Sequence, residues 1–88
     1  MGAKKIVISK PFEKIFASLP ENIREATYRK LEMFLHSISH PSLRVKKIKG
    51  TERMWEMRIT MNYRLTFEIW DDAIFLRKIG THEILSSP

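Results

Sequence analysis

The chain has 88 residues, no cysteine, 43% apolar residues and a formal net charge of +6. Its length predicts a single domain over residues 1–88, and its apolar content is too high for a disordered tail. No apolar run approaches the roughly 20 residues that span a bilayer, and without cysteine there are no disulfides or thiolate metal sites. We expect a cytoplasmic domain with an acidic partner, for which RNA, DNA, an anionic membrane and an acidic protein all qualify on charge alone.

The first half of the chain has the pattern of one strand followed by two helices. Lys5-Ile6-Val7-Ile8 is a β-branched run that predicts a strand, and Ser9-Lys10-Pro11 is typical of a helix start. A second helix is predicted from Glu21, after the break at Pro20, and it must end before Pro41. Two consecutive amphipathic helices with a short break predict a helical hairpin. The apolar stripes comprise Phe12, Ile15, Phe16 and Leu19 in the first helix, and Ile23, Ala26, Thr27, Leu31, Phe34, Leu35 and Ile38 in the second.

In the second half, the hydrophobic period changes from 3.6 to 2 residues, which is typical of strands. Residues 55–60 and 63–69 alternate between apolar and polar side chains, and the short Met61-Asn62 break between these runs predicts a tight hairpin. Asp71-Asp72 has the composition of the next turn. Residues 74–79 are mostly apolar, as in a central strand.

The expected sheet contains one further strand, which precedes the hairpin in the sequence. A strand is predicted at residues 43–49, closed by Gly50-Thr51-Glu52, and Gly80 is expected to end the strand at 74–79. The predicted fold class is α+β, with the N-terminal strand and the helical hairpin packed on one face of a small antiparallel β-sheet.

The alternation of side chains predicts a polar and uncovered second face of this sheet. If the apolar residues of the hairpin pack under the helices, their neighbours point away from the core. Those neighbours are Glu56, Arg58, Thr60, Arg64, Thr66 and Glu68, with Lys46, Lys47 and Lys49 nearby. Arg58 and Arg64 would lie on adjacent strands, where their planar guanidinium groups suit a phosphodiester. The alternative is a solvated face held by cross-strand ion pairs, which the excess of cations disfavours.

Several other signals are weaker. His36 and His40 have a spacing that can hold a metal, but no third ligand is evident and Pro41 interrupts the helix, so no metal or other cofactor is expected. Trp55 is expected in the core, whereas Trp70 stands at a strand end and is the aromatic residue expected to be exposed.

From Ile48 onward the sequence resembles the RelE/ParE toxin superfamily, most closely its RelE/YafQ-like ribonuclease branch. The resemblance covers nearly the whole chain, because the preceding strand–helix–helix pattern also fits. The matching segments have the order and spacing of the family, and they are Ile48-Lys49-Gly50, Arg58-Ile59-Thr60, Tyr63-Arg64-Leu65-Thr66-Phe67 and Gly80-Thr81-His82-Glu83-Ile84-Leu85.

The resemblance implies an enzyme that cuts messenger RNA in the ribosomal A site without a metal. In this chemistry the 2′-hydroxyl attacks its own phosphate and leaves a 2′,3′-cyclic phosphate and a 5′-hydroxyl. His82 matches a functional histidine of a related branch and is assigned proton transfer. Arg58 and Arg64 match positions that stabilise the scissile phosphate. Lys46, Lys47, Lys49 and Arg77 are expected to contact the backbone of the message or of ribosomal RNA.

The chain also departs from the family pattern. Glu56 stands where the RelE-like branch has a lysine, and it is a candidate for the general base or for an ion pair with Arg58 or Arg64. The aromatic residue that the branch carries near its C-terminus is missing from Leu85-Ser86-Ser87-Pro88. The general base therefore stays unassigned.

Two other functions remain open from the sequence. One is a ParE-like protein that inhibits DNA gyrase, although such a binder has no evident need for His82. The other is a catalytically weak relative that only binds its antitoxin and co-represses their operon. In each case the resemblance implies an acidic antitoxin as partner, with operator DNA bound only through that antitoxin.

Overall fold

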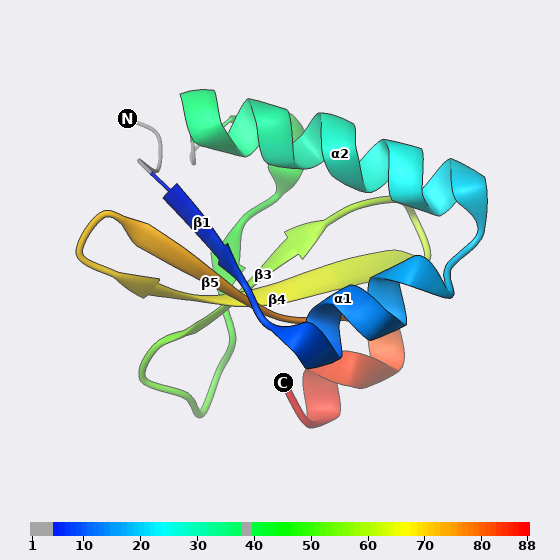
Figure 1. Cartoon of the computed structure of the whole chain (residues 1–88). Coiled ribbons are helices and arrows are strands. Elements are labelled where there is room, and N and C mark those ends of the chain that lie inside the picture. The colour runs from blue at the N-terminus through cyan, green and yellow to red at the C-terminus, as the bar shows by residue number, and fades with distance from the viewer. Residues whose placement is uncertain (1–4, 38–39) are drawn as a thin grey trace.

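The computed structural model describes residues 5–37 and 40–88 and contains a five-stranded sheet in the order β1-β5-β4-β3-β2. Two helices, α1 and α2, pack against one face of this sheet, and the short helix η2 lies on the other side (Figure 1). The elements are β1 Lys5–Ile8, α1 Lys10–Ala17, α2 Glu21–His36, η1 Pro41–Leu43, β2 Lys46–Lys47, β3 Met54–Arg58, β4 Tyr63–Trp70, β5 Ala73–Thr81 and η2 His82–Ser86.

The expected strand and helical hairpin are confirmed at the start of the chain. Ser9 caps α1, because its side-chain oxygen accepts a hydrogen bond from the backbone N–H of Phe12 at 3.3 Å. Pro20 immediately precedes α2, which ends at His36, before Pro41 as predicted. Ile38, which the sequence placed on the apolar face of this helix, lies outside the described residues.

The core lies between the helices and the facing side of the sheet. Phe34 of α2 contacts Phe67 of β4 edge to face, with ring centroids 4.9 Å apart. Met57 and Leu65 face each other in the β3–β4 register and are fully buried in the same cluster. Trp55 packs against this cluster, as the sequence predicted. The two-residue period of the hairpin therefore does direct its apolar residues toward the helices.

Two features of the expected sheet differ in the structure: the direction of one strand pairing and the length of one strand. β1 pairs with β5 in parallel, so the sheet is mixed rather than purely antiparallel. Such a pairing needs a long connection, and here it comprises everything between the two strands, from α1 to β4. The strand predicted at 43–49 is reduced to the two residues of β2. Pro41 starts the helix η1 instead, and Arg44 ends it with a positive φ of 48°.

The turns also differ in detail from the prediction. Four residues, 59–62, connect β3 to β4 in place of the expected two, and the N–H groups of Ile59 and Thr60 both donate to the carbonyl of Tyr63. Met61-Asn62 lacks the glycine that favours a two-residue hairpin turn. Asp71-Asp72 forms the predicted turn, with Asp71 at a φ of 53°. Gly80 lies within β5, which continues to Thr81.

The second face of the sheet is partly covered, contrary to the sequence prediction. Thr66 and Arg64 on β4 and Glu56 on β3 are buried on this side. The cover includes η2, which packs on β4 and β5. A side chain at Gly80 would bring its Cβ to 2.9 Å from Cγ2 of Ile84, so only glycine lets η2 approach this closely. No helix in the described ranges is long and apolar enough to cross a membrane.

Replacing Gly80 by alanine is expected to push η2 away from the sheet and to destabilise the fold by about 1–3 kcal/mol, as overpacking does. Urea unfolding of Gly80→Ala measures this cost. The same substitution in an Ile84→Ala background is the control, because the clashing methyl group is then absent. An equal cost in both backgrounds would show that the contact with Ile84 is not its source.

Candidate functional site

A polar cavity of about 410 Å³ opens on the sheet face opposite the helices. Three segments that are distant in the sequence contribute to it: residues 44–46, the β3–β4 hairpin and the start of η2. Its lining residues are Arg44, Val45, Lys46, Glu56, Arg58, Arg64 and His82. The cavity therefore gathers four permanent cations and one imidazole around a single carboxylate.

Strand register brings these side chains together. Arg58 and Arg64 are direct partners in the β3–β4 pair, and Lys46 of β2 is the partner of Glu56. Arg64 is also opposite Gly80 on β5, two residues before His82. Because alternate residues of a strand share one face, the register places Glu56, Arg58 and Arg64 on the same side of the sheet.

Arg64 has a structural task in addition to its place in the cavity. Its side chain is 9% exposed, and Nη1 donates to the backbone carbonyls of Thr60, Met61 and Tyr63 at 2.8, 3.0 and 3.1 Å. These carbonyls belong to the connection between β3 and β4 and its flank. The guanidinium group of Arg64 thus holds this turn with one nitrogen while it lines the cavity.

The charged groups of Glu56 and Arg58 have no polar partner within the described residues. Glu56 is only 8% exposed, yet within the described ranges neither its carboxylate nor the guanidinium of Arg58 forms a hydrogen bond or an ion pair. No buried side-chain oxygen or nitrogen in this part of the chain lacks a partner, so the carboxylate oxygens of Glu56 reach the solvent of the cavity. The cross-strand ion pairs that the sequence offered as an alternative are therefore not formed by Glu56.

Arg44 is a cavity residue that the sequence analysis missed. It has a left-handed backbone conformation, which is uncommon for a residue other than glycine, and its N–H donates to the carbonyl of Pro41 at 3.2 Å. The neighbouring Leu43 is fully buried and anchors the short helix η1. The sequence pattern did not indicate this position for Arg44, because the residue lies in the segment 43–49 that was predicted as a strand.

The other predicted basic residues lie elsewhere. Lys47 is the partner of Trp55, one position along β2 from the cavity residue Lys46, and it lines a separate shallow hollow together with Lys49. Arg77 pairs with Glu68 at 3.3 Å and borders a different groove. The structure thus brings Lys46 together with the predicted catalytic residues, but not Lys47, Lys49 or Arg77.

The histidines at the end of α2 have no metal cluster around them. His40 caps η1, where its Nδ1 accepts a hydrogen bond from the backbone N–H of Ser42 at 3.2 Å. Within residues 5–37 and 40–88, no three His, Asp or Glu side chains lie close enough to hold a metal ion.

The two arginines should respond differently to truncation. Arg64→Ala removes three hydrogen bonds and leaves turn carbonyls without their donor, so we expect a loss of about 1–3 kcal/mol in the free energy of unfolding. Arg58→Ala removes no such contact and should change stability by less than about 0.5 kcal/mol. Urea titrations of both variants test this difference, and equal losses would contradict the structural role of Arg64.

Comparison with known proteins finds similar structures over nearly the whole chain. No family model and no curated protein matches the chain. Among solved structures, it is similar to a chain of the RelB–RelE antitoxin–toxin complex from Methanococcus jannaschii, with 27% identity and a TM-score of 0.75 over 91% of this chain and 94% of that chain.

Two further structures agree with this match. A chain of the archaeal RelE–RelB complex from Pyrococcus horikoshii OT3 has 20% identity and a TM-score of 0.72, covering 92% of this chain and 96% of that chain. A mutant of the E. coli toxin RelE in the free state has 21% identity and a TM-score of 0.72, covering 96% of this chain and 92% of that chain. The chain therefore has the fold of the RelE toxins, in agreement with the resemblance that the sequence showed.

Proposed function

We propose that this chain is the toxin of a toxin–antitoxin system and that it cuts messenger RNA in the ribosomal A site without a metal ion. The single observation that supports this proposal best is the cavity, where Arg58, Arg64, His82 and Glu56 meet. These groups are the three kinds that cleavage by an internal 2′-hydroxyl needs: cations at the phosphate, a proton donor and a proton acceptor.

The scissile phosphate is best accommodated beside Arg58. Its guanidinium has no partner in the described part of the chain, so all its donors are available to a phosphate. Arg64 lies opposite Arg58 in the strand register and adds a second positive charge at a fixed position. Arg44 and Lys46 line the same cavity and supply contacts to the neighbouring RNA backbone.

Glu56 and His82 are the candidates for the two proton transfers. The Glu56 carboxylate takes the proton of the 2′-hydroxyl as that oxygen attacks phosphorus. The bond between phosphorus and the 5′ oxygen then breaks, and the imidazolium of His82 gives its proton to the leaving oxygen. The products are a 2′,3′-cyclic phosphate and a 5′-hydroxyl. The proposal thus gives Glu56 the role of the base, for which the sequence offered it as a candidate.

The partners follow from the fold and the charge. RelB–RelE complexes among the similar structures support an antitoxin, which we expect to be acidic because this chain carries a net charge of +6. Lys47 and Lys49 line a separate hollow and are suited to the backbone of ribosomal RNA. We expect the protein to act in the cytoplasm and to reach operator DNA only through the antitoxin.

The fold alone does not separate this function from gyrase inhibition. A structure described as a YoeB/ParE toxin from Agrobacterium tumefaciens has a TM-score of 0.73 at 13% identity. The polar cavity favours RNA cleavage, because a gyrase inhibitor needs no proton donor and acceptor around a phosphate site. Primer-extension mapping of translated messages after induced expression, beside a gyrase supercoiling assay, separates the two. Supercoiling inhibition without cuts would refute the nuclease.

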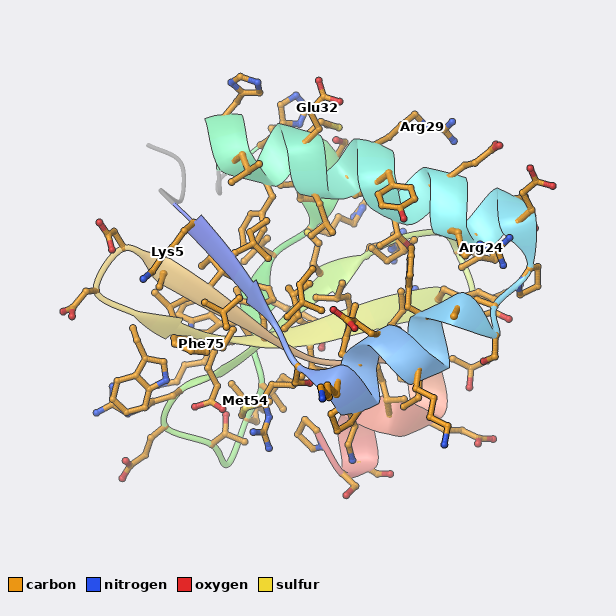
Figure 2. The ribbon with its side chains drawn as sticks, viewed as in Figure 1. Lys5, Arg24, Arg29, Glu32, Met54 and Phe75 are labelled. Atoms are coloured by element: carbon orange, nitrogen blue, oxygen red, sulfur yellow. The ribbon has the colours of Figure 1, made fainter. Side chains whose placement is uncertain are left out.

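Arg58→Ala is expected to slow cleavage of ribosome-bound message by about 10²–10³-fold, because it removes charge stabilisation from the transition state. The matched control is Arg29→Ala, since Arg29 lies on α2, far from the cavity, on the other side of the sheet (Figure 2). Single-turnover cleavage rates of the two variants provide the measurement. Wild-type rates from Arg58→Ala would remove Arg58 from the reaction.

The pH dependence of cleavage tests the two proton transfers. Glu56 must be ionised to accept a proton and His82 must be protonated to donate one, so the rate should fall on both sides of an optimum. Glu56→Gln should lower the rate and abolish the fall toward low pH, whereas His82→Gln should abolish the fall toward high pH. If Glu56→Gln abolished the fall toward high pH and His82→Gln the fall toward low pH, His82 would be the base and Glu56 the acid. An unchanged pH profile in both variants would refute the assignment.

A further inference from the structure

A second and larger hollow lies on the same face of the sheet, and it extends from the β4–β5 hairpin across β5 to β1 and the start of α1. Its volume is about 680 Å³, and its walls include Trp70, Phe75, Glu68, Arg77 and Lys78. The β4–β5 hairpin, which carries Trp70, lies at one end of the sheet and η2 at the other (Figure 1). The hollow and the catalytic cavity therefore lie on the same face of the sheet, and Lys78, which lines the hollow, donates to the carbonyl of Ser87 at the end of η2.

Strand β4 runs beneath both sites, with Thr66 fully buried between them. Arg64, Thr66, Glu68 and Trp70 alternate along it and so share this face. Trp70 is six positions beyond Arg64, which corresponds to about 20 Å along a strand. A polymer anchored by a phosphate in the cavity reaches Trp70 within a few nucleotides.

Trp70 is held in one orientation although it is 44% exposed. Its indole N–H donates to Oε1 of Glu68 at 3.1 Å, and the guanidinium carbon of Arg53 lies 3.8 Å from the ring centroid. Phe75, the cross-strand partner of Glu68, is 36% exposed on the same face (Figure 2). A fixed aromatic ring covered on one face by a cation leaves its other face available for stacking.

The charges around this ring select the kind of ligand. Arg53 lies over the ring, and Arg77 and Lys78 line the hollow together with Glu68, whose oxygens already engage Trp70 and Arg77. Asp71 and Asp72 follow Trp70 in the turn, outside the lining of the hollow. A ligand that suits this surface combines negative charge with flat aromatic groups. Single-stranded RNA has both properties, because its phosphates repeat along the chain and every base has a face that can stack.

We propose that Trp70, backed by Arg53, is a stacking platform for a base of the RNA whose phosphate occupies the cavity. This proposal rests on the proposed function for the position of that phosphate. The platform binds any base, since stacking alone does not read the Watson–Crick edge. Trp70 thus contributes to the binding of substrate and takes no part in proton transfer.

Binding of two matched oligonucleotides tests the platform separately from the cleavage chemistry. The first is an eight-nucleotide 2′-O-methyl RNA, which cannot be cut because its 2′ oxygen is blocked. The second is an abasic oligomer of the same length, which keeps the phosphates and lacks the bases. We expect wild-type protein to bind the first about tenfold more tightly, within the range of one base stacked on an aromatic side chain. Titrations followed by fluorescence anisotropy of labelled oligomers give both dissociation constants.

Three variants distinguish the possible outcomes. Trp70→Ala should abolish the preference for the base-containing oligomer, whereas Trp70→Phe should retain most of it. Tyr28→Ala removes a similarly exposed aromatic side chain from α2, on the other side of the sheet, and should change neither constant. Thermal melts of each variant establish that it is folded.

A Trp70→Ala protein that keeps the preference overturns the platform, as does one that binds both oligomers normally but loses affinity for an acidic antitoxin peptide. Arg58→Ala should weaken both oligomers equally, because it contacts phosphate. If Arg58→Ala changes neither constant while Trp70→Ala still abolishes the preference, the platform stands and the phosphate site of the proposed function fails.

Discussion

The pairing of β3 with β4 in a single register determines on which face of the sheet Glu56, Arg58 and Arg64 lie. In this register Trp55 is opposite Phe67 on the core side, and Glu56 is opposite Thr66 on the other side. A slip of one residue would turn the arginines toward the helices and expose the apolar side chains, so the buried core strongly disfavours it. The same hydrophobic contacts that stabilise the sheet therefore orient the cations of the cavity.

Arg64 both stabilises the β3–β4 connection and lines the candidate site. Its Nη1 holds the carbonyls of the β3–β4 connection, and the same guanidinium lines the cavity. A positive charge placed this way keeps its position without a bound phosphate, which is the preorganisation that electrostatic catalysis requires. Arg58 lacks such contacts and depends on the strand alone for its position. Under the proposed function, a change of Arg64 combines a structural and a chemical effect, whereas a change of Arg58 affects the chemistry alone.

The sheet face opposite the helices is a surface with distinct parts. Helix η2 covers one end, where Gly80 allows Ile84 to approach the sheet, and His82 begins this helix at the edge of the cavity. The other end carries the exposed ring of Trp70 beside Arg53. In the proposed function, the first part binds a phosphate of the RNA and the second stacks one of its bases, while Thr66 between them stays buried.

The sequence by itself determined the order and type of most elements and the side of the hairpin on which Arg58 and Arg64 lie. It did so because helix and strand periods are local properties of the chain. Only the tertiary structure decided that η2 covers part of that face, that β1 joins β5 in parallel, and that Arg44 enters the cavity while Arg77 pairs with Glu68. These features depend on contacts between distant segments and on one left-handed backbone position, which no local pattern of side chains encodes.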